Sequence, residues 1–346
     1  MSVGKKILKY SSLEELVIKL NRDGKQVFAP VKKDNIVDFA HISGLNEMAD
    51  DYIITVQSAK FVAFPSVETL FEVETSKDKV TLKDKDFSNI PEIVLLGTRP
   101  CDASGFIILN KMFGGEYKDT IYSARIAKTT LISISCNKAD SKCFCTSVGG
   151  NPGSTSGSDL LLTRIENNEF LAEIITEKGE AIVSKYPELF GTAPEVNKDK
   201  YLADVPVDIN LDGMSGKIYS QFDSDIWMEQ SLRCIGCGTC AYVCPTCGCF
   251  DIQDVYDGHT GQHKRSWDSC GFSLFTLHAS GHNPRNVQSQ RWRQRIMHKF
   301  VYLPEQQDMI GCVGCGRCSR ACSANMNLKE NLILLKEKIE KSVNKP

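Results

Sequence analysis

Eight of the fifteen cysteines fall into two runs that share one spacing. Residues 234–244 (CIGCGTCAYVC) and 312–322 (CVGCGRCSRAC) both read C-x2-C-x2-C-x3-C, with Ser323 after the second run where proline is usual. This spacing is typical of paired cubane clusters, in which the first three cysteines of a run bind one cluster and the fourth binds the other. We therefore expect two [4Fe–4S] clusters, one on Cys234, Cys237, Cys240 and Cys322, and one on Cys312, Cys315, Cys318 and Cys244.

Four cysteines of the N-terminal half have a pattern of their own. Residues 92–102 (EIVLLGTRPCD) and 129–137 (TTLISISCN) read as buried parallel strands with a helix between them. The carboxyl ends of parallel strands share one edge of a sheet, so a cysteine after each strand and two in the following loop should converge there. The sequence predicts a third cluster on Cys101, Cys136, Cys143 and Cys145. The alternative is that these are inert core and loop thiols.

Cys247, Cys249 and Cys270 remain outside these sets. One interpretation is that they are buried thiols that line a cluster pocket. The other interpretation is a redox-active dithiol or a further metal site, which could hold a fourth cluster. The fourth ligand of such a metal site would be His259, His263 or a solvent molecule.

Composition limits the classes of protein. The chain has 346 residues and a net charge of −2, so no general attraction to nucleic acid or to an anionic membrane is expected. No apolar run reaches the roughly 18–20 residues of a membrane span, and the N-terminus has no signal peptide pattern. We therefore expect a soluble, cytoplasmic protein in which cysteines bind metal rather than form disulfides. No Walker or dinucleotide fingerprint indicates a flavin or nicotinamide site.

The elements that position these cysteines suggest two domains and an α+β fold. Residues 1–204 alternate helix and strand, which predicts an α/β domain with a mixed sheet, and residues 11–24 predict a helix with a capping box of Ser12 and Glu15. Residues 204–217 are turn-rich and predict a linker at the start of the second domain. Residues 205–346 as a whole predict an α-helical, ferredoxin-like domain with two clusters. Leu332, Leu335 and Ile339 would form one face of its last helix.

A basic stretch lies between the two cysteine runs. It carries Arg285, Arg291, Arg293, Arg295 and Lys299. The usual interpretation is a solvated helix face. The alternatives are a docking surface for a partner protein, or positive charge that raises the potential of a nearby cluster.

Five segments together resemble a known family: TRPCD, CFCTSVGG, CIGCGTCAYVCPTCGC, ASGHNPR and CVGCGRC. The chain resembles, from about residue 26 to 330, the iron–sulfur subunit of anaerobic sulfite reductase and the β-subunit of cytoplasmic sulfhydrogenase-type NiFe hydrogenases, and is slightly nearer the hydrogenase branch. The resemblance implies several [4Fe–4S] clusters in a protein that sits between a γ-type subunit, which binds flavin and NAD(P)H, and a catalytic hydrogenase or sulfite reductase subunit. It also matches the N-terminal cysteines as a set, and Cys247, Cys249 and Cys270 without settling their role.

The resulting expectation is an electron relay without catalytic residues of its own. One alternative is a self-standing iron–sulfur reductase of a sulfur or disulfide substrate that uses Cys247, Cys249 and Cys270. Another is a zinc-stabilised interaction protein.

Overall fold

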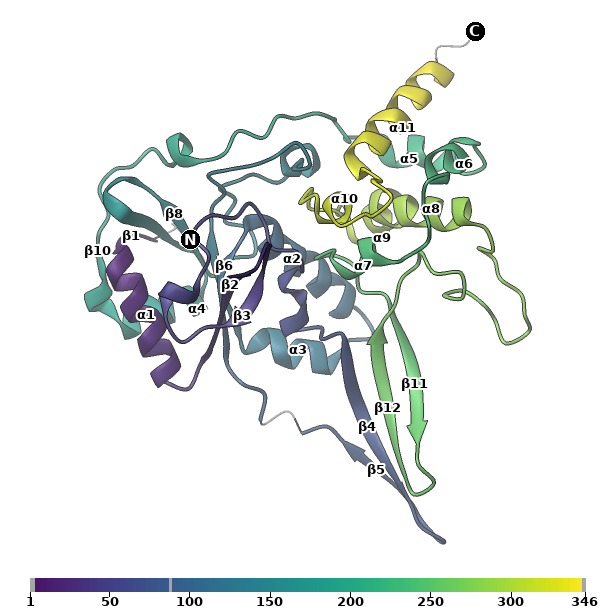
Figure 1. Ribbon diagram of the computed structural model, residues 1–346, viewed down its shortest axis with the longest axis horizontal. Helices are drawn as coiled ribbons and strands as arrows, with labels where there is room; N and C mark the ends of the chain where they lie inside the picture. Colours follow the sequence, from purple (N-terminus) through teal and green to yellow (C-terminus); the bar gives the residue numbers. More distant parts are fainter. Residues whose placement is uncertain (1–3, 87–88, 344–346) are drawn as a thin grey trace.

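A large mixed sheet organises the N-terminal half. The computed structural model describes residues 4–86 and 89–343 (Figure 1). The strands of this sheet are β1 (Gly4–Lys9), β2 (Gln26–Lys33), β3 (Ile36–His41), β6 (Ile93–Thr98), β7 (Thr129–Ile134), β8 (Leu160–Arg164), β9 (Glu169–Ile174) and β10 (Phe190–Thr192). Their order is β10-β1-β9-β8-β7-β6-β2-β3. The pairs β2–β6, β6–β7 and β7–β8 are parallel and the others antiparallel, so the sheet is mixed, as predicted.

Helices cover both faces of this sheet because its central strands are apolar on both sides. The helices of this half are α1 (Tyr10–Arg22), α2 (Pro100–Phe113), α3 (Thr120–Ala127) and α4 (Glu177–Lys185). In β6, Val94 and Leu96 share a core with α1 and α4, whereas Leu95 shares a core with α2 and α3. The predicted capping box is wrong, because α1 begins at Tyr10 and has no side-chain cap.

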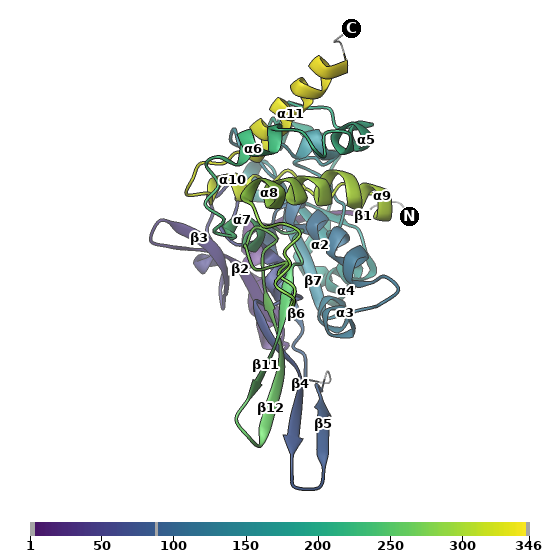
Figure 2. The same cartoon turned by 90° about the vertical axis from the view of Figure 1, so that its right-hand side faces the viewer.

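A second sheet joins the two halves of the chain. Its strands are β4 (Val67–Thr75), β5 (Val80–Asp84), β11 (Phe250–Tyr256) and β12 (Thr260–Trp267), in the order β11-β12-β4-β5. The two hairpins form an arm that projects from the body of the molecule (Figures 1 and 2). The β11–β12 hairpin lies between the two cysteine runs, and its strand β12 pairs with β4 of the N-terminal half. The sheet therefore crosses the predicted domain boundary at residue 204.

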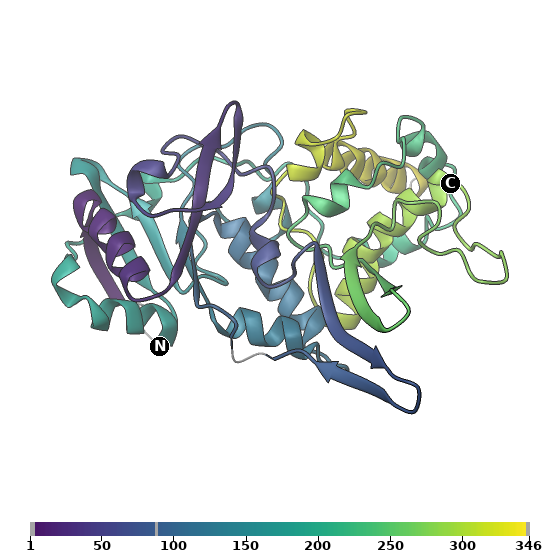
Figure 3. The same ribbon diagram turned by 60° about the horizontal axis from the view of Figure 1, so that its bottom comes forward.

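Helices dominate the rest of the C-terminal half (Figure 3). They are α5 (Met214–Tyr219), α6 (Ile226–Ser231), α7 (Thr239–Tyr242), α8 (Gln288–Met297), a π-turn (His298–Tyr302), α9 (Leu303–Gln307), α10 (Arg317–Arg320) and α11 (Leu328–Val343). Leu332, Leu335 and Ile339 of α11 are buried, as predicted. None of the helices in the described residues is long and apolar enough to cross a membrane.

Short 3-10 turns complete the chain: η1 (Leu45–Glu47), η2 (Ala59–Val62), η3 (Cys145–Val148), η4 (Glu166–Asn168), η5 (Pro187–Leu189) and η6 (Lys198–Tyr201).

Candidate iron–sulfur centres

The four N-terminal cysteines line one cavity at the edge of the large sheet. Cys101 lies in the first turn of α2, directly after β6, and Cys136 follows β7. Cys143 and Cys145 come from the next loop and line the same cavity. The parallel pairing of β6 with β7 is therefore the feature that brings thiols from separate parts of the chain together. Cys315, from the second cysteine run, lines this cavity as well.

Arg99 fixes this edge of the sheet. Its guanidinium is buried and donates to the carbonyl oxygens of Ser135 at 2.9 Å and Ile53 at 3.0 Å. These bonds hold the segment before Cys136 against the segment before Cys101. Burial raises the pKa of Cys136, while Arg99 lowers it. A positive charge beside the cavity favours a thiolate, which is the form that binds iron.

A second cavity gathers Cys234, Cys237, Cys240 and Cys322. These are the four thiols that the pairing rule assigns to one cluster. Gly236 and Gly238 have φ values of +70° and +72°, so the loop turns between the cysteines in a conformation that side chains disfavour. The Gln288 amide donates to Cys234 Sγ at 3.1 Å. Cys270 and Cys318 also line this cavity.

Cys244, Cys312, Cys315 and Cys318 form a third group, between the other two. Burial raises the pKa of Cys312 to about 12 and that of Cys315 to about 11, and the charges of Cys244 and Cys318 contribute to both increases. The four thiols are therefore near neighbours. Since Cys315 also lines the N-terminal cavity and Cys318 the second, the three groups are contiguous.

Three buried cations lie around Cys244 and Cys247. Lys299 Nζ lies 3.5 Å from Cys244 Sγ, 2.7 Å from Thr246 Oγ1 and 2.7 Å from the Gly311 carbonyl oxygen. Arg295 Nη1 lies 3.8 Å from Cys247 Sγ. Lys60, from η2, donates to the Cys247 carbonyl oxygen at 2.9 Å and lies over the ring of Trp267.

The surroundings of these cations test whether this part of the chain could hold an iron–sulfur cluster. Their partners named above are thiol, hydroxyl and carbonyl groups and an aromatic ring, whereas buried charges require a counter-charge. Cysteine thiolates around a cluster supply that negative charge. The predicted solvated face is therefore wrong for Arg291, Arg295 and Lys299, which are buried.

The surroundings of Arg317 also indicate that the chain could hold an iron–sulfur cluster. The Arg317 side chain is buried, forms an ion pair with Asp102 at 2.9 Å, and leaves Nη1 without a hydrogen-bond partner among the described residues. Its charge acts on both Cys101 and Cys315. An unsatisfied buried N–H donor beside two such thiols suits the acceptor sulfides of a cluster. The residues around these thiols therefore suit [4Fe–4S] clusters.

No three Cys, His, Asp or Glu side chains within residues 4–86 and 89–343 approach one another closely enough to hold a single metal ion. A cubane does not require that approach, because each of its four thiolates binds a different iron.

Comparisons with known proteins support a 4Fe-4S domain that contains the two cysteine runs. Residues 233–326 match the family model of a 4Fe-4S dicluster domain. The chain is 28% identical over 309 residues to "Sulfhydrogenase 2 subunit beta" of Pyrococcus furiosus, covering 87% of this chain and 89% of the relative. Over this length the chain is similar to that sulfhydrogenase β-subunit. No solved structure matched the chain.

The three thiols outside these groups, Cys247, Cys249 and Cys270, each contact another cysteine. Cys247 contacts Cys244, and Cys249 contacts Cys270. The hydrogen bond from Cys270 lowers the pKa of Cys249 to about 6. The proposed histidine ligands are elsewhere: His263 Nδ1 lies 2.6 Å from Asp254 Oδ1 and its ring stacks on Phe71 in the arm, and His259 lies at the tip of the β11–β12 hairpin.

Sequence reasoning missed several residues that surround the thiols. Lys60 is not part of any motif, and no sequence pattern predicts its contact with Cys247. Arg317 and Arg320 lie within the second cysteine run, so their proximity to the thiols could have been predicted from the sequence. Arg320 donates to Cys143 Sγ at 3.2 Å and pairs with Asp140, which ties the N-terminal cysteine loop to that run.

His298 makes stability depend on pH. Burial lowers the pKa of His298 to about 4, with contributions from Lys299, Arg285 and Arg295. Its ordinary pKa is about 6.5, so between these values the unfolded chain binds more protons than the folded chain, and stability falls as the pH drops. We expect a loss of about 2 kcal/mol between pH 7 and pH 5 from this group.

Urea unfolding of the full chain and of His298→Gln at both pH values measures this loss. The variant should lose about 2 kcal/mol less than the parent chain on acidification. Equal losses in the two proteins would show that His298 does not carry the pH dependence.

Proposed function

We propose that the chain is the electron-transfer subunit of a multi-subunit oxidoreductase and relays single electrons through three [4Fe–4S] clusters. The electrons pass between a γ-type subunit, which binds flavin and NAD(P)H, and a catalytic subunit of the NiFe hydrogenase or sulfite reductase type. The name of the homologue and the dicluster match support this function, and the family resemblance supplies the partners and a cytoplasmic location.

The observation that carries the proposal is the continuity of the three thiol groups. Cys315 belongs to the central group and lines the N-terminal cavity, and Cys318 belongs to the central group and lines the second cavity. An electron that enters at one end of this series therefore has a neighbouring site at each step.

When bound, the clusters supply reversible one-electron oxidation and reduction. The chain's own residues exclude water, hold the thiols and set the local charge. Gln288, Arg320 and Lys299 each direct an N–H group at a cysteine sulfur. Hydrogen bonds and positive charge of this kind raise a reduction potential. Lys299 touches no carboxylate in the contacts described above, while Asp140 pairs with Arg320, so the central group is expected to have a higher potential than the N-terminal group.

Counting iron and acid-labile sulfide per chain tests the proposal. The anaerobically prepared full chain should contain about twelve irons, and Cys143→Ser about eight, because three four-iron clusters are reduced to two. Cys249→Ser is the matched control and should retain about twelve. About eight irons in all three proteins would contradict a cluster in the N-terminal cavity.

A second candidate function is favoured by the contact between Cys249 and Cys270. In this alternative, these thiols and Cys247 reduce a sulfur or disulfide substrate. Turnover by the isolated chain with an artificial donor, lost in Cys249→Ser at unchanged iron content, would support it over the relay. A count near sixteen irons that falls in Cys249→Ser would instead indicate a fourth cluster.

A further inference from the structure

We propose that the surface around Cys237 is the docking site of a one-electron carrier protein with an acidic rim. The proposal rests on the relay function and adds a further partner, a soluble carrier, to the two subunits named above. The surface consists of residues 232–238 and of the loop 271–287.

Cys237 is where the series of thiols reaches solvent. Among the fifteen cysteines, all of which lie in described residues, fourteen are buried or half-buried and Cys237 is exposed. It lines the second cavity together with Cys234 and Cys240. A carrier protein that covers Cys237 would therefore approach this cavity more closely than one that docks over the buried central group.

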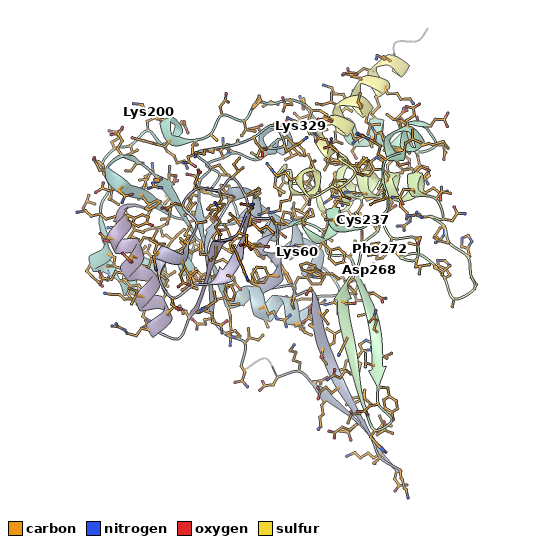
Figure 4. The ribbon with its side chains drawn as sticks, viewed as in Figure 1. Lys60, Lys200, Cys237, Asp268, Phe272 and Lys329 are labelled. Carbon is orange, nitrogen blue, oxygen red and sulfur yellow. The ribbon has the colours of Figure 1, made fainter. Side chains whose placement is uncertain are left out.

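The beginning of the loop 271–287 lies directly against the turn that carries Cys237. A side chain at Gly238 would collide with the ring of Phe272, and one at Gly236 would meet Gln288 Oε1 at 3.1 Å and the Gly271 carbonyl oxygen at 3.5 Å. Cys237 and Phe272 are labelled in Figure 4, beside the base of the arm.

Large apolar side chains are exposed on this surface. They come from both segments: Leu232, Ile235, Leu274, Leu277 and Val287. Leu232 is 78% exposed, Ile235 71% and Leu274 70%. Exposed apolar patches mark interaction sites, and protein interfaces have an apolar centre with a polar rim.

The charge of this surface indicates which kind of partner protein would bind there. No acidic residue occurs between Glu229 and Asp251, or between Asp268 and Glu305. Arg285 is half-exposed, and the exposed Arg233 lines a hollow in which three basic side chains outnumber two acidic ones: Arg233, Lys338 and Lys341 against Glu229 and Glu337. The whole chain is nevertheless slightly acidic, with a net charge of −2, so the positive character is local. A partner with an acidic rim would be attracted to it, and salt would weaken the association.

Reduction of the full, cluster-loaded chain by a reduced plant-type [2Fe–2S] ferredoxin, an acidic one-electron carrier, tests the proposal. One electron leaves the ferredoxin and one enters the chain in each encounter. Stopped-flow absorbance gives the second-order rate, and dithionite serves as a small donor that needs no docking surface. The variants are Leu274→Glu and Arg233→Glu, with Leu82→Glu as control, because Leu82 is 65% exposed on β5 in the arm.

The rate with ferredoxin should fall with rising salt and should fall about tenfold in Leu274→Glu and in Arg233→Glu. Leu82→Glu should match the parent chain, and all proteins should react alike with dithionite. Equal ferredoxin rates in all variants would overturn the docking site while leaving the relay intact. A chain that dithionite cannot reduce would overturn the relay itself, and the docking site with it.

A membrane surface is the competing occupant of a basic, apolar patch. Sedimentation with phosphatidylserine vesicles separates the two. Binding of the parent chain that is lost in Leu274→Glu would overturn the proposal, and absence of binding at the salt concentration that supports ferredoxin reduction would support it.

Discussion

Arg317→Met should lower the free energy of unfolding by about 3–5 kcal/mol, because it leaves a buried carboxylate without its partner. Arg317 is 1% exposed and Asp102 is 2% exposed, and the ion pair joins the second cysteine run to the first turn of α2. Arg317 also donates to the carbonyl oxygen of Thr55 at 3.0 Å. Urea unfolding of the full chain measures the change.

Two further variants separate the ion pair from general disruption. The double variant Arg317→Met with Asp102→Leu removes both charges, so it should be closer to the parent chain than Arg317→Met alone. Lys83→Met removes an exposed ion pair with Glu74 and should cost at most about 1 kcal/mol. If Arg317→Met is no more harmful than Lys83→Met, the buried pair does not join the two halves as described.

Gly314→Ala should destabilise the contact between the second cysteine run and the N-terminal cysteine loop. Gly314 has a φ of +62°, and an added Cβ would lie 2.5 Å from the backbone of Phe144 and Cys145. The Phe144 amide donates to the Gly314 carbonyl oxygen at 2.9 Å, so the two backbones cannot separate without losing this bond. We expect a loss of about 3–5 kcal/mol, from the left-handed conformation and the overpacking together.

The matched control is Gly213→Ala. Gly213 has a φ of +64°, but an added Cβ would have no atom within 4 Å. It should therefore cost only the conformational part, about 1–2 kcal/mol. A thermal melt that shows equal shifts for the two variants would contradict close packing at Gly314. Loss of about four irons in Gly314→Ala alone would link that packing to the N-terminal cluster.

Local patterns predicted the elements that carry the thiols. The apolar run before Cys101 and the run before Cys136 became β6 and β7, and their parallel pairing follows from the helix between them. Motif spacing grouped Cys322 with Cys234, Cys237 and Cys240, and the structure places these four on one cavity. In each case a pattern that can be recognised within a single strand or a single cysteine run was sufficient.

Long-range contacts could not be predicted in this way. β11 has exposed residues throughout and β12 carries charged side chains, so neither reads as part of an apolar sheet. Nothing local indicates that β12 pairs with β4. The burial of Arg295 and Lys299 was missed for a different reason: a basic run indicates solvent exposure unless its counter-charge is known, and here that charge comes from sulfur atoms elsewhere in the chain.

The pairing of β4 with β12 has a consequence for how the protein is made. On the ribosome, β4 emerges long before β12, and until Thr260–Trp267 has been synthesised one edge of β4 has no partner. Cys101, Cys136, Cys143 and Cys145 emerge in that interval, while Gly314, which packs against their loop, is still to come. Closure of the N-terminal cavity therefore belongs to the end of translation, and iron delivered to the nascent chain would meet an open set of thiols.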